Sequence, residues 1–210
     1  MWMISVWIAV TGGWMDTSIH KPLPAVWNQP NLQVQFQPTP EWRTYPFPSV
    51  SLPRVVYKDG QKYTLSWTLE CWELAEQNRR TDASRSILLR FEKVSVPDPL
   101  SPDFVLDRIR EWKILQFQLH LRDADSVQLQ ESTDLHPLTL PKPLKGVVWN
   151  YSADRFSLFL SPVSRVNVRT LVIVDDVQKS LVMISLECED EEALDKLWKG
   201  VLASVKIVSK

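Results

Sequence analysis

The residue types that carry acid–base or metal chemistry are scattered along this sequence. Its three histidines, His20, His120 and His136, lie far apart, without a spacing such as HxxxH that would place two metal ligands on one helix face. It has no nucleophile elbow, no phosphate-binding glycine loop and no paired CxxC. We therefore predict that the protein is not an enzyme and that it holds no cofactor and no metal.

Two interpretations are open for an acidic run near the C-terminal end. It consists of Glu187, Glu189, Asp190, Glu191 and Glu192. One interpretation is a cation site, and the other is the solvated start of a helix. Consecutive acids at a helix start fan out rather than converge, and the helix dipole favours negative charge there. We favour the helix start, with Asp190 as its N-cap.

The two cysteines, Cys71 and Cys188, each lie in or at the end of an apolar, strand-like run. Such a position is typical of a buried free thiol. A disulfide between them is the alternative, because the sequence alone does not place the two residues relative to each other.

The overall composition is that of a globular protein with unusual tryptophan and proline contents. The 210 residues include 10 Trp, 15 Pro and 5 Gly, and suit one domain or one domain with an extension. Lys plus Arg number 24 against 25 Asp plus Glu, so the formal charge is close to zero. A nucleic-acid-binding domain would need a clustered basic face, and we predict no nucleic-acid partner.

The first residues contain an apolar stretch from Trp2 to Val10, which is too short to span a bilayer. Its length suits the core of a signal peptide, but a basic n-region and a small-x-small cleavage site are missing. A buried first strand and a mis-assigned start are the alternatives. We predict no membrane span and a cytoplasmic location.

Prolines divide the chain into two regions. Eight of the 15 prolines fall between Pro22 and Pro53. Within this region Leu32–Pro38 alternates apolar and polar residues and predicts a short strand, which the prolines confine to an edge or a surface. A polyproline ligand is a further interpretation. We predict that residues 1–53 are a Pro/Trp-rich extension packing on a single α+β domain formed by residues 54–210.

Hairpins dominate the second region. Asp59-Gly60 between two apolar-rich arms predicts a tight turn. Val166–Asp176 and Ser180–Cys188 predict a second hairpin, whose apolar runs on both faces indicate central strands. Further strands are predicted at Ser86–Val96, Ser126–Gln130, Lys145–Tyr151 and Phe156–Leu160.

Two helices are predicted. Ser101-Pro102-Asp103 has the residues of a helix start, and an apolar stripe follows to about Leu121. From Leu115 onward a strand-like alternation competes with this helix. The closing helix has a wide apolar face. That face consists of Ala193, Leu194, Leu197, Trp198, Val201, Leu202 and Val205.

The tryptophans have two uses. Trp67, Trp112 and Trp198 fall on predicted core faces. The others either pin the N-terminal region to the sheet or form an aromatic, charge-poor surface that contacts a partner. On the second interpretation, the predicted contact residues are Trp14, Trp27, Trp42 and Trp72.

The element order resembles the PsbP-like family, whose fold is shared by DcrB-like and Mog-like proteins. The resemblance covers "SILLRFEKVSVPDPLSPDFVLDRI", the strands that follow and the closing "LDKLWKGVLASVKI", with Ser204-Val205 matching a dipeptide near the family's last helix. It implies an antiparallel sheet flanked by helices, an α/β/α sandwich, and action by binding rather than catalysis. The Pro/Trp-rich extension and the missing leader depart from the family.

These observations predict a non-enzymatic protein-binding module: an adaptor, an accessory chaperone or an immunity-type partner that buries an apolar segment of another protein. The alternatives are an envelope- or thylakoid-associated PsbP-like protein, and a small-ligand carrier or enzyme using dispersed acidic residues.

Overall fold

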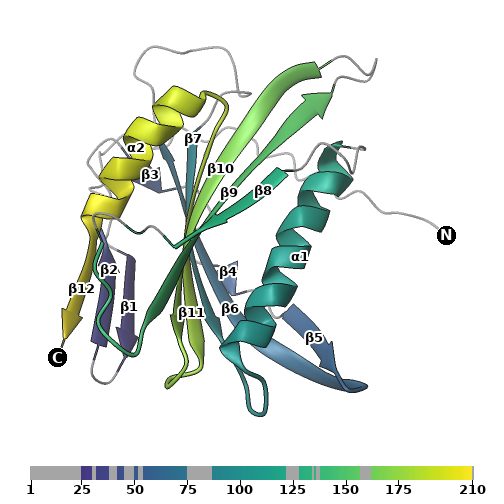
Figure 1. The fold of residues 1–210 in the computed structure, drawn as a ribbon, viewed down its shortest axis with the longest axis vertical. Helices are drawn as coiled ribbons and strands as arrows, with labels where there is room; N and C mark the ends of the chain where they lie inside the picture. The colour runs from purple at the N-terminus through teal and green to yellow at the C-terminus, as the bar shows by residue number, and fades with distance from the viewer. Residues whose placement is uncertain are drawn as a thin grey trace, which may run out of the picture.

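Two antiparallel sheets and two helices make up the part of the chain that the structure, a computed structural model, describes (Figure 1). The described residues are 25–29, 32–37, 42–44, 50–51, 54–74, 87–121, 128–133, 135, 138–156 and 162–209. The strands are β1 (Ala25–Gln29), β2 (Leu32–Phe36), β3 (Trp42–Thr44), β4 (Val50–Ser51), β5 (Arg54–Lys58), β6 (Gln61–Leu74), β7 (Ile87–Ser95), β8 (Gln128–Ser132), β9 (Lys145–Phe156), β10 (Pro162–Asp175), β11 (Ser180–Cys188) and β12 (Val205–Ser209). The helices are α1 (Pro102–Leu121) and α2 (Glu191–Ser204).

The main sheet has the strand order β3-β6-β7-β11-β10-β9-β8, and β4 and β5 also pair with β6. Both predicted hairpins are confirmed. Asp59 and Gly60 turn between β5 and β6 with φ of 51° and 78°, a left-handed pair that suits the twist of a two-residue hairpin. The β10–β11 hairpin lies at the centre of the sheet, which explains why its strands are apolar on both faces.

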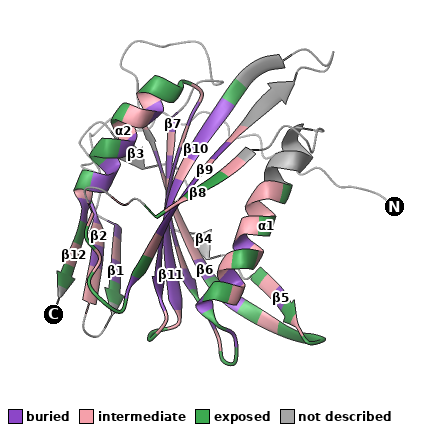
Figure 2. Cartoon of the chain, viewed as in Figure 1, coloured by how far each residue is buried: buried purple, intermediate pink, exposed green. Residues whose placement is uncertain are grey.

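Each face of the main sheet is buried against a different layer, as Figure 2 shows by the burial along the central strands. On one face, α1 covers a core that includes Leu65, Val94, Ile109, Val172 and Met183. On the other face, α2 packs together with the small sheet β1-β2-β12 over a second core. This second core includes Trp27, Phe36, Trp72, Leu89 and Trp198.

The prediction of an α+β fold in the form of a PsbP-like α/β/α sandwich was wrong. The described chain is mostly strand, and a second antiparallel sheet occupies part of the layer that helices were expected to form. The clearest cause is Val205–Ser209, which continues the apolar pattern of the predicted closing helix. Helix α2 instead ends at Ser204, and the β-branched residues Val205, Ile207 and Val208 pair with β2. Strand pairing with β2, rather than the local sequence pattern, therefore sets whether this segment is helix or strand.

The helix starts were predicted well because their signals are local. The Ser101 hydroxyl accepts a hydrogen bond from the Phe104 N–H, and α1 runs from Pro102 to Leu121. The Asp190 carboxylate accepts bonds from the N–H groups of Glu192 and Ala193 at the start of α2. Other strand predictions differ from the structure in their bounds or fall on residues that are not described. Strand β8 begins two residues after the predicted start, and residues 157–160 are not described.

The boundary at residue 53 stays a prediction. Four strands before it, β1 to β4, pair with β12 or β6 or with each other, and residues 1–24 lie outside the described part. None of the helices in the described part is long and apolar enough to cross a bilayer.

Candidate functional site

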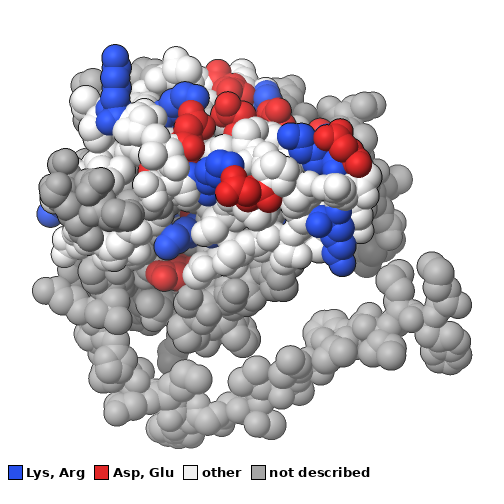
Figure 3. Space-filling view, turned by 90° about the horizontal axis from the view of Figure 1, so that it is seen from below, with Lys and Arg blue, Asp and Glu red and all other residues white. Residues whose placement is uncertain are grey.

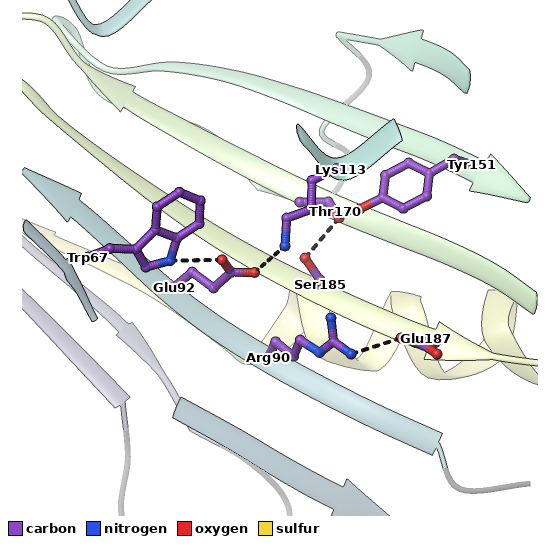
Figure 4. Close-up of polar contacts among 8 residues, drawn as sticks. All are labelled: Trp67, Arg90, Glu92, Lys113, Tyr151, Thr170, Ser185 and Glu187. Carbon is purple, nitrogen blue, oxygen red and sulfur yellow. Dashed lines mark hydrogen bonds and ion pairs between the residues drawn. The ribbon is translucent and has the colours of Figure 1, made fainter. Parts of the chain in front are cut away.

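A buried carboxylate lies at the centre of a polar cluster beneath α1 (Figure 4). Glu92 on β7 is buried, and its two oxygens accept hydrogen bonds from the Trp67 Nε1–H at 2.9 Å and from the Lys113 ammonium at 2.6 Å. Lys113 comes from α1, where its side chain is 13% exposed. The ion pair therefore joins the middle of α1 to the sheet through the low-dielectric interior.

The cluster continues across the strands. The hydroxyls of Tyr151, Thr170 and Ser185 form a chain with separations of 3.0 and 2.9 Å. Arg90 donates to Glu187 at 3.2 Å on the same face of the sheet. Each polar group drawn in Figure 4 thus has a partner inside the cluster.

Burial also governs the chemistry of the neighbouring thiol and phenol. It raises the pKa of Cys71, and the nearby Arg90 and Lys113 charges offset this only in part. It likewise raises the pKa of Tyr151. A thiol and a phenol held in their protonated forms are poor nucleophiles and poor bases at neutral pH. We assign this cluster to the docking of α1 on the sheet.

A polar pocket opens on the opposite face of the sheet, beside the first turn of α2. Its volume is about 200 Å³. Strands β8, β9 and β10 supply its floor, and Glu191 and Leu194 of α2 supply one wall. The polar floor residues are Gln130, Asn150, Ser152, Arg165, Asn167 and Arg169. We call these residues, with Glu191 and Leu194, the polar pocket.

Strand register places the floor residues in cross-strand rows. Gln130 on β8 lies opposite Asn150 on β9, and Asn150 lies opposite Arg169 on β10. Ser152 lies opposite Asn167 in the next row. Directly opposed residues have Cβ atoms about 5 Å apart, so each row brings its side chains within reach of one another.

The two guanidinium groups of the polar pocket have partners within the protein. Arg165 donates to the Ser152 hydroxyl at 2.7 Å, and Arg169 forms an ion pair with Asp195 on α2. Asn167 donates from Nδ2 to the backbone carbonyl of Glu189 at 3.1 Å. These contacts fix the rim and join β10 to the start of α2.

The carboxamides of the first row are not engaged within the described part of the chain. Asn150 Oδ1 is buried and accepts no hydrogen bond there. Its neighbour Gln130 is exposed and makes no side-chain hydrogen bond with the described residues. Asn150 Oδ1 is therefore a buried acceptor without a partner among the described residues, whereas the Gln130 carboxamide of the same row is exposed.

The tryptophans predicted to contact a partner lie elsewhere. Trp27 and Trp72 are fully buried in the core between the two sheets, where Trp72 packs edge-on against Phe36 at a ring separation of 5.9 Å. Their side chains are not available to a partner in this structure. The backbone of Trp42 belongs to β3, but its side chain and all of Trp14 lie outside the described residues.

The acidic run has several separate roles. Asp190 caps α2, Glu187 pairs with Arg90 on the far face, and Glu191 lines the polar pocket. Among the described residues, no group of three His, Cys, Asp or Glu side chains is arranged to hold a metal ion. Cys71 and Cys188 are both free thiols, so the disulfide alternative is not formed.

Sequence reasoning missed the polar pocket, although part of its signal is present in the sequence. Arg165, Asn167 and Arg169 alternate with Val166 and Val168, which indicates one polar face at the start of a strand that is apolar further on. The contribution of β8, β9 and α2 to the same pocket depends on contacts between distant segments.

Comparisons with known proteins give no family. No protein-family model and no curated protein matches the chain. Among solved structures, the chain is similar to the crystal structure of LpqN, which is involved in cell envelope biogenesis of Mycobacterium tuberculosis. The identity is 11%, the match covers 89% of this chain and 90% of that chain, and the TM-score is 0.41. A likeness at this level carries no argument about function, and the PsbP-like resemblance is not confirmed.

Proposed function

We propose that the chain is a non-enzymatic protein-binding module that receives a side chain of another protein in the polar pocket. The observation that carries this proposal is the pocket itself, which combines a concave shape with a lining of mostly polar side chains. Its volume of about 200 Å³ lies below the roughly 300–1,000 Å³ typical of sites for small organic ligands. A single side chain matches this space better than a metabolite or a nucleotide does.

The chemistry of the lining supports binding rather than catalysis. Carboxamides and guanidinium groups are neither nucleophiles nor general acids at neutral pH. The Ser152 hydroxyl accepts a hydrogen bond from Arg165, and no histidine or cysteine is among the described residues that line the pocket. Elsewhere in the described part, the buried carboxylate Glu92 is bonded to Trp67 and Lys113, which leaves it poorly placed to act on a substrate.

The proposed mechanism differs from the one expected from the aromatic residues. Trp27 and Trp72 hold the small sheet against the main sheet and cannot form the docking surface in this structure. The polar pocket replaces them as the anchor point. An adaptor, an accessory chaperone and an immunity-type partner would each use such an anchor, and a cytoplasmic location stays a prediction for all three.

Selection from a random peptide library displayed on phage tests the proposal with the full chain as bait. The affinity of the best peptide is then measured for the unmodified chain and for Asn150→Leu, which keeps the side-chain size and removes the carboxamide. We expect Asn150→Leu to weaken binding at least tenfold. Thermal unfolding of each variant separates lost binding from lost folding.

Asn28→Leu is the matched control, since Asn28 is an exposed asparagine on β1 of the small sheet. This variant should bind the peptide as the unmodified chain does. If the two variants weaken binding equally, or neither does, the polar pocket is not the binding site. A small-ligand carrier would instead be stabilised by a compound in a metabolite panel and would select no peptide.

A further inference from the structure

We infer that strand β5 and the neighbouring flank of α1 bind an acidic, extended segment of a partner protein. Figure 1 shows β5 at the outer side of the main sheet, beside the first half of α1. The surface consists of Arg54, Val56 and Lys58 of β5 with Phe104 and Arg108 of α1, and we call it the basic edge. It lies on the α1 side of the main sheet, so it is separate from the polar pocket and adds a second binding surface.

Strand β5 has one side of its backbone without a partner strand in the described part of the chain. It pairs with β6 over Arg54–Lys58 and with no other described strand. An edge strand presents a row of unpaired N–H and C=O groups, and an extended peptide can join such a row as an added strand. The strand has no proline, so each of its residues carries an N–H group.

Two cations on this edge lack a counter-ion. Arg54 and Lys58 form no ion pair with the described residues. They lie instead over aromatic rings, with the Arg54 Cζ 5.7 Å from the centroid of the Trp67 ring and the Lys58 Nζ 5.5 Å from that of Phe104. A cation–π contact positions a cation without neutralising its charge. Both charges therefore remain available to an anionic group.

Helix α1 adds a third cation to the basic edge. The Arg108 Cζ is 5.3 Å from the centroid of the Phe104 ring, so Arg108 and Lys58 share one ring. Arg108 is paired with Glu111, but the two side chains are 43% and 60% exposed, and a pair so exposed is weak. Asp59, in the turn next to Lys58, forms no ion pair with the described residues. Positive charge thus exceeds negative charge here.

The other acids in this half of α1 face away from β5. Asp103 and Asp107 are exposed and lie about 200° around the helix from the buried Val105 and Ile109. They point to solvent, whereas the positions of the basic edge lie on the flank of the helix that faces β5. These acids therefore leave the charge of the basic edge uncompensated.

The alternation of β5 sets the pattern of the partner segment. Val56 packs in the core beneath α1, so Arg54 and Lys58 lie on the same face, and Val55 and Tyr57 lie on the other. Side chains of an added strand fall in the same cross-strand rows. Two carboxylates four residues apart would face the two cations, with an apolar residue midway beside Val56.

A protein segment fits this surface better than a single-stranded nucleic acid does. Proteins that bind single strands stack the bases on free aromatic faces. Here Trp67 is only 6% exposed and carries Arg54, while Phe104 carries two cations. The unpaired strand edge offers hydrogen bonds that match a peptide backbone.

Two labelled peptides of identical composition test the inference by fluorescence anisotropy with the full chain. One has Glu-Thr-Val-Thr-Glu at its centre, and the other has Thr-Glu-Val-Glu-Thr, which removes the four-residue spacing of the acids. We expect the first to bind at least fivefold more tightly than the second, and than a version with Gln in place of Glu. Its affinity should fall as NaCl is added. A short single-stranded RNA is titrated in parallel.

Variants of the protein locate the binding surface. Arg54→Gln and Lys58→Gln should each weaken binding of the first peptide at least fivefold, with thermal unfolding showing that each variant is folded. Lys62→Gln is the matched control, since Lys62 lies opposite Tyr57 and thus on the other face of the same hairpin. This control and Asn150→Leu should leave the affinity unchanged.

An equal loss with Lys62→Gln would overturn the inference, because it would indicate general charge attraction. Absence of binding, equal binding of the two peptides, or tighter binding of the RNA would overturn it too. A loss of binding with Asn150→Leu alone would place the peptide in the polar pocket and contradict the basic edge while supporting the proposed function.

Discussion

Two sets of polar residues on opposite faces of the main sheet differ in how completely they are satisfied. Beneath α1, Glu92 is bonded on both oxygens, and its partners Trp67 and Lys113 are themselves largely buried. Beside α2, Asn150 Oδ1 is buried and lacks a partner among the described residues. A satisfied buried network stabilises and orients its elements, whereas a buried group without a partner costs stability.

The Glu92–Lys113 ion pair is predicted to stabilise the protein only while both partners are present. Glu92→Gln keeps an acceptor for the Trp67 indole but leaves Lys113 as a buried charge without its counter-ion. Removing one partner of such a pair costs about 3 kcal/mol, which urea unfolding measures. Adding Lys113→Met should recover at least half of that loss. A further loss on adding Lys113→Met would contradict the assignment.

Tyr151 is predicted to make stability fall at alkaline pH. Burial raises its pKa in the folded protein, so above about pH 10 the unfolded chain loses the phenol proton while the folded chain keeps it. The unfolded state then binds fewer protons, and the free energy of unfolding decreases as the pH rises.

Tyr151→Phe removes this contribution. The difference in unfolding free energy between the unmodified chain and Tyr151→Phe should therefore shrink between pH 9 and pH 11, by about 1 kcal/mol for one pH unit above the unfolded pKa. A constant difference over this range would show that Tyr151 ionises equally in both states.

At the scale of the elements, short-range signals were sufficient wherever a single turn or cap fixes the conformation. Asp59-Gly60, Ser101-Pro102 and Asp190 each determine a local geometry and were predicted from sequence. Val205–Ser209 was not, because its conformation depends on β2, which lies about 170 residues earlier in the chain. The polar pocket was missed for the same reason, since Gln130, Asn150 and Arg169 become neighbours only through strand pairing.

Helix α1 is predicted to be stabilised mainly by its first half. Val105 and Ile109 are fully buried, whereas Leu115 is 49% exposed. Ile109→Ala should destabilise the protein by about 2–5 kcal/mol because it leaves a cavity, as urea unfolding would show. Leu115→Ala, which removes a side chain of similar size, should change stability by about 0.5 kcal/mol or less. Equal costs would indicate that the second half of α1 is also packed.

At the scale of the whole molecule, the main sheet separates a layer formed by α1 from a layer formed by α2 and the small sheet. Helix α1 packs on one face through its apolar residues and Lys113, while α2 and the small sheet cover the other face, where the polar pocket lies beside the start of α2. Figure 3 shows basic and acidic residues interspersed on the face turned toward the viewer, with no large area of one sign among the described residues. Recognition by hydrogen bonds in a small pocket is consistent with such a surface.

Mapping a bound peptide onto the protein tests this account most directly. The measurement is the change in backbone and side-chain amide resonances of the ¹⁵N-labelled full chain on titration with the selected peptide. We predict that the largest changes fall at the polar pocket, on Gln130, Asn150, Ser152 and the first turn of α2, and that the Trp67 and Lys113 resonances stay unchanged. Largest changes beneath α1, with the polar pocket unaffected, would contradict the account.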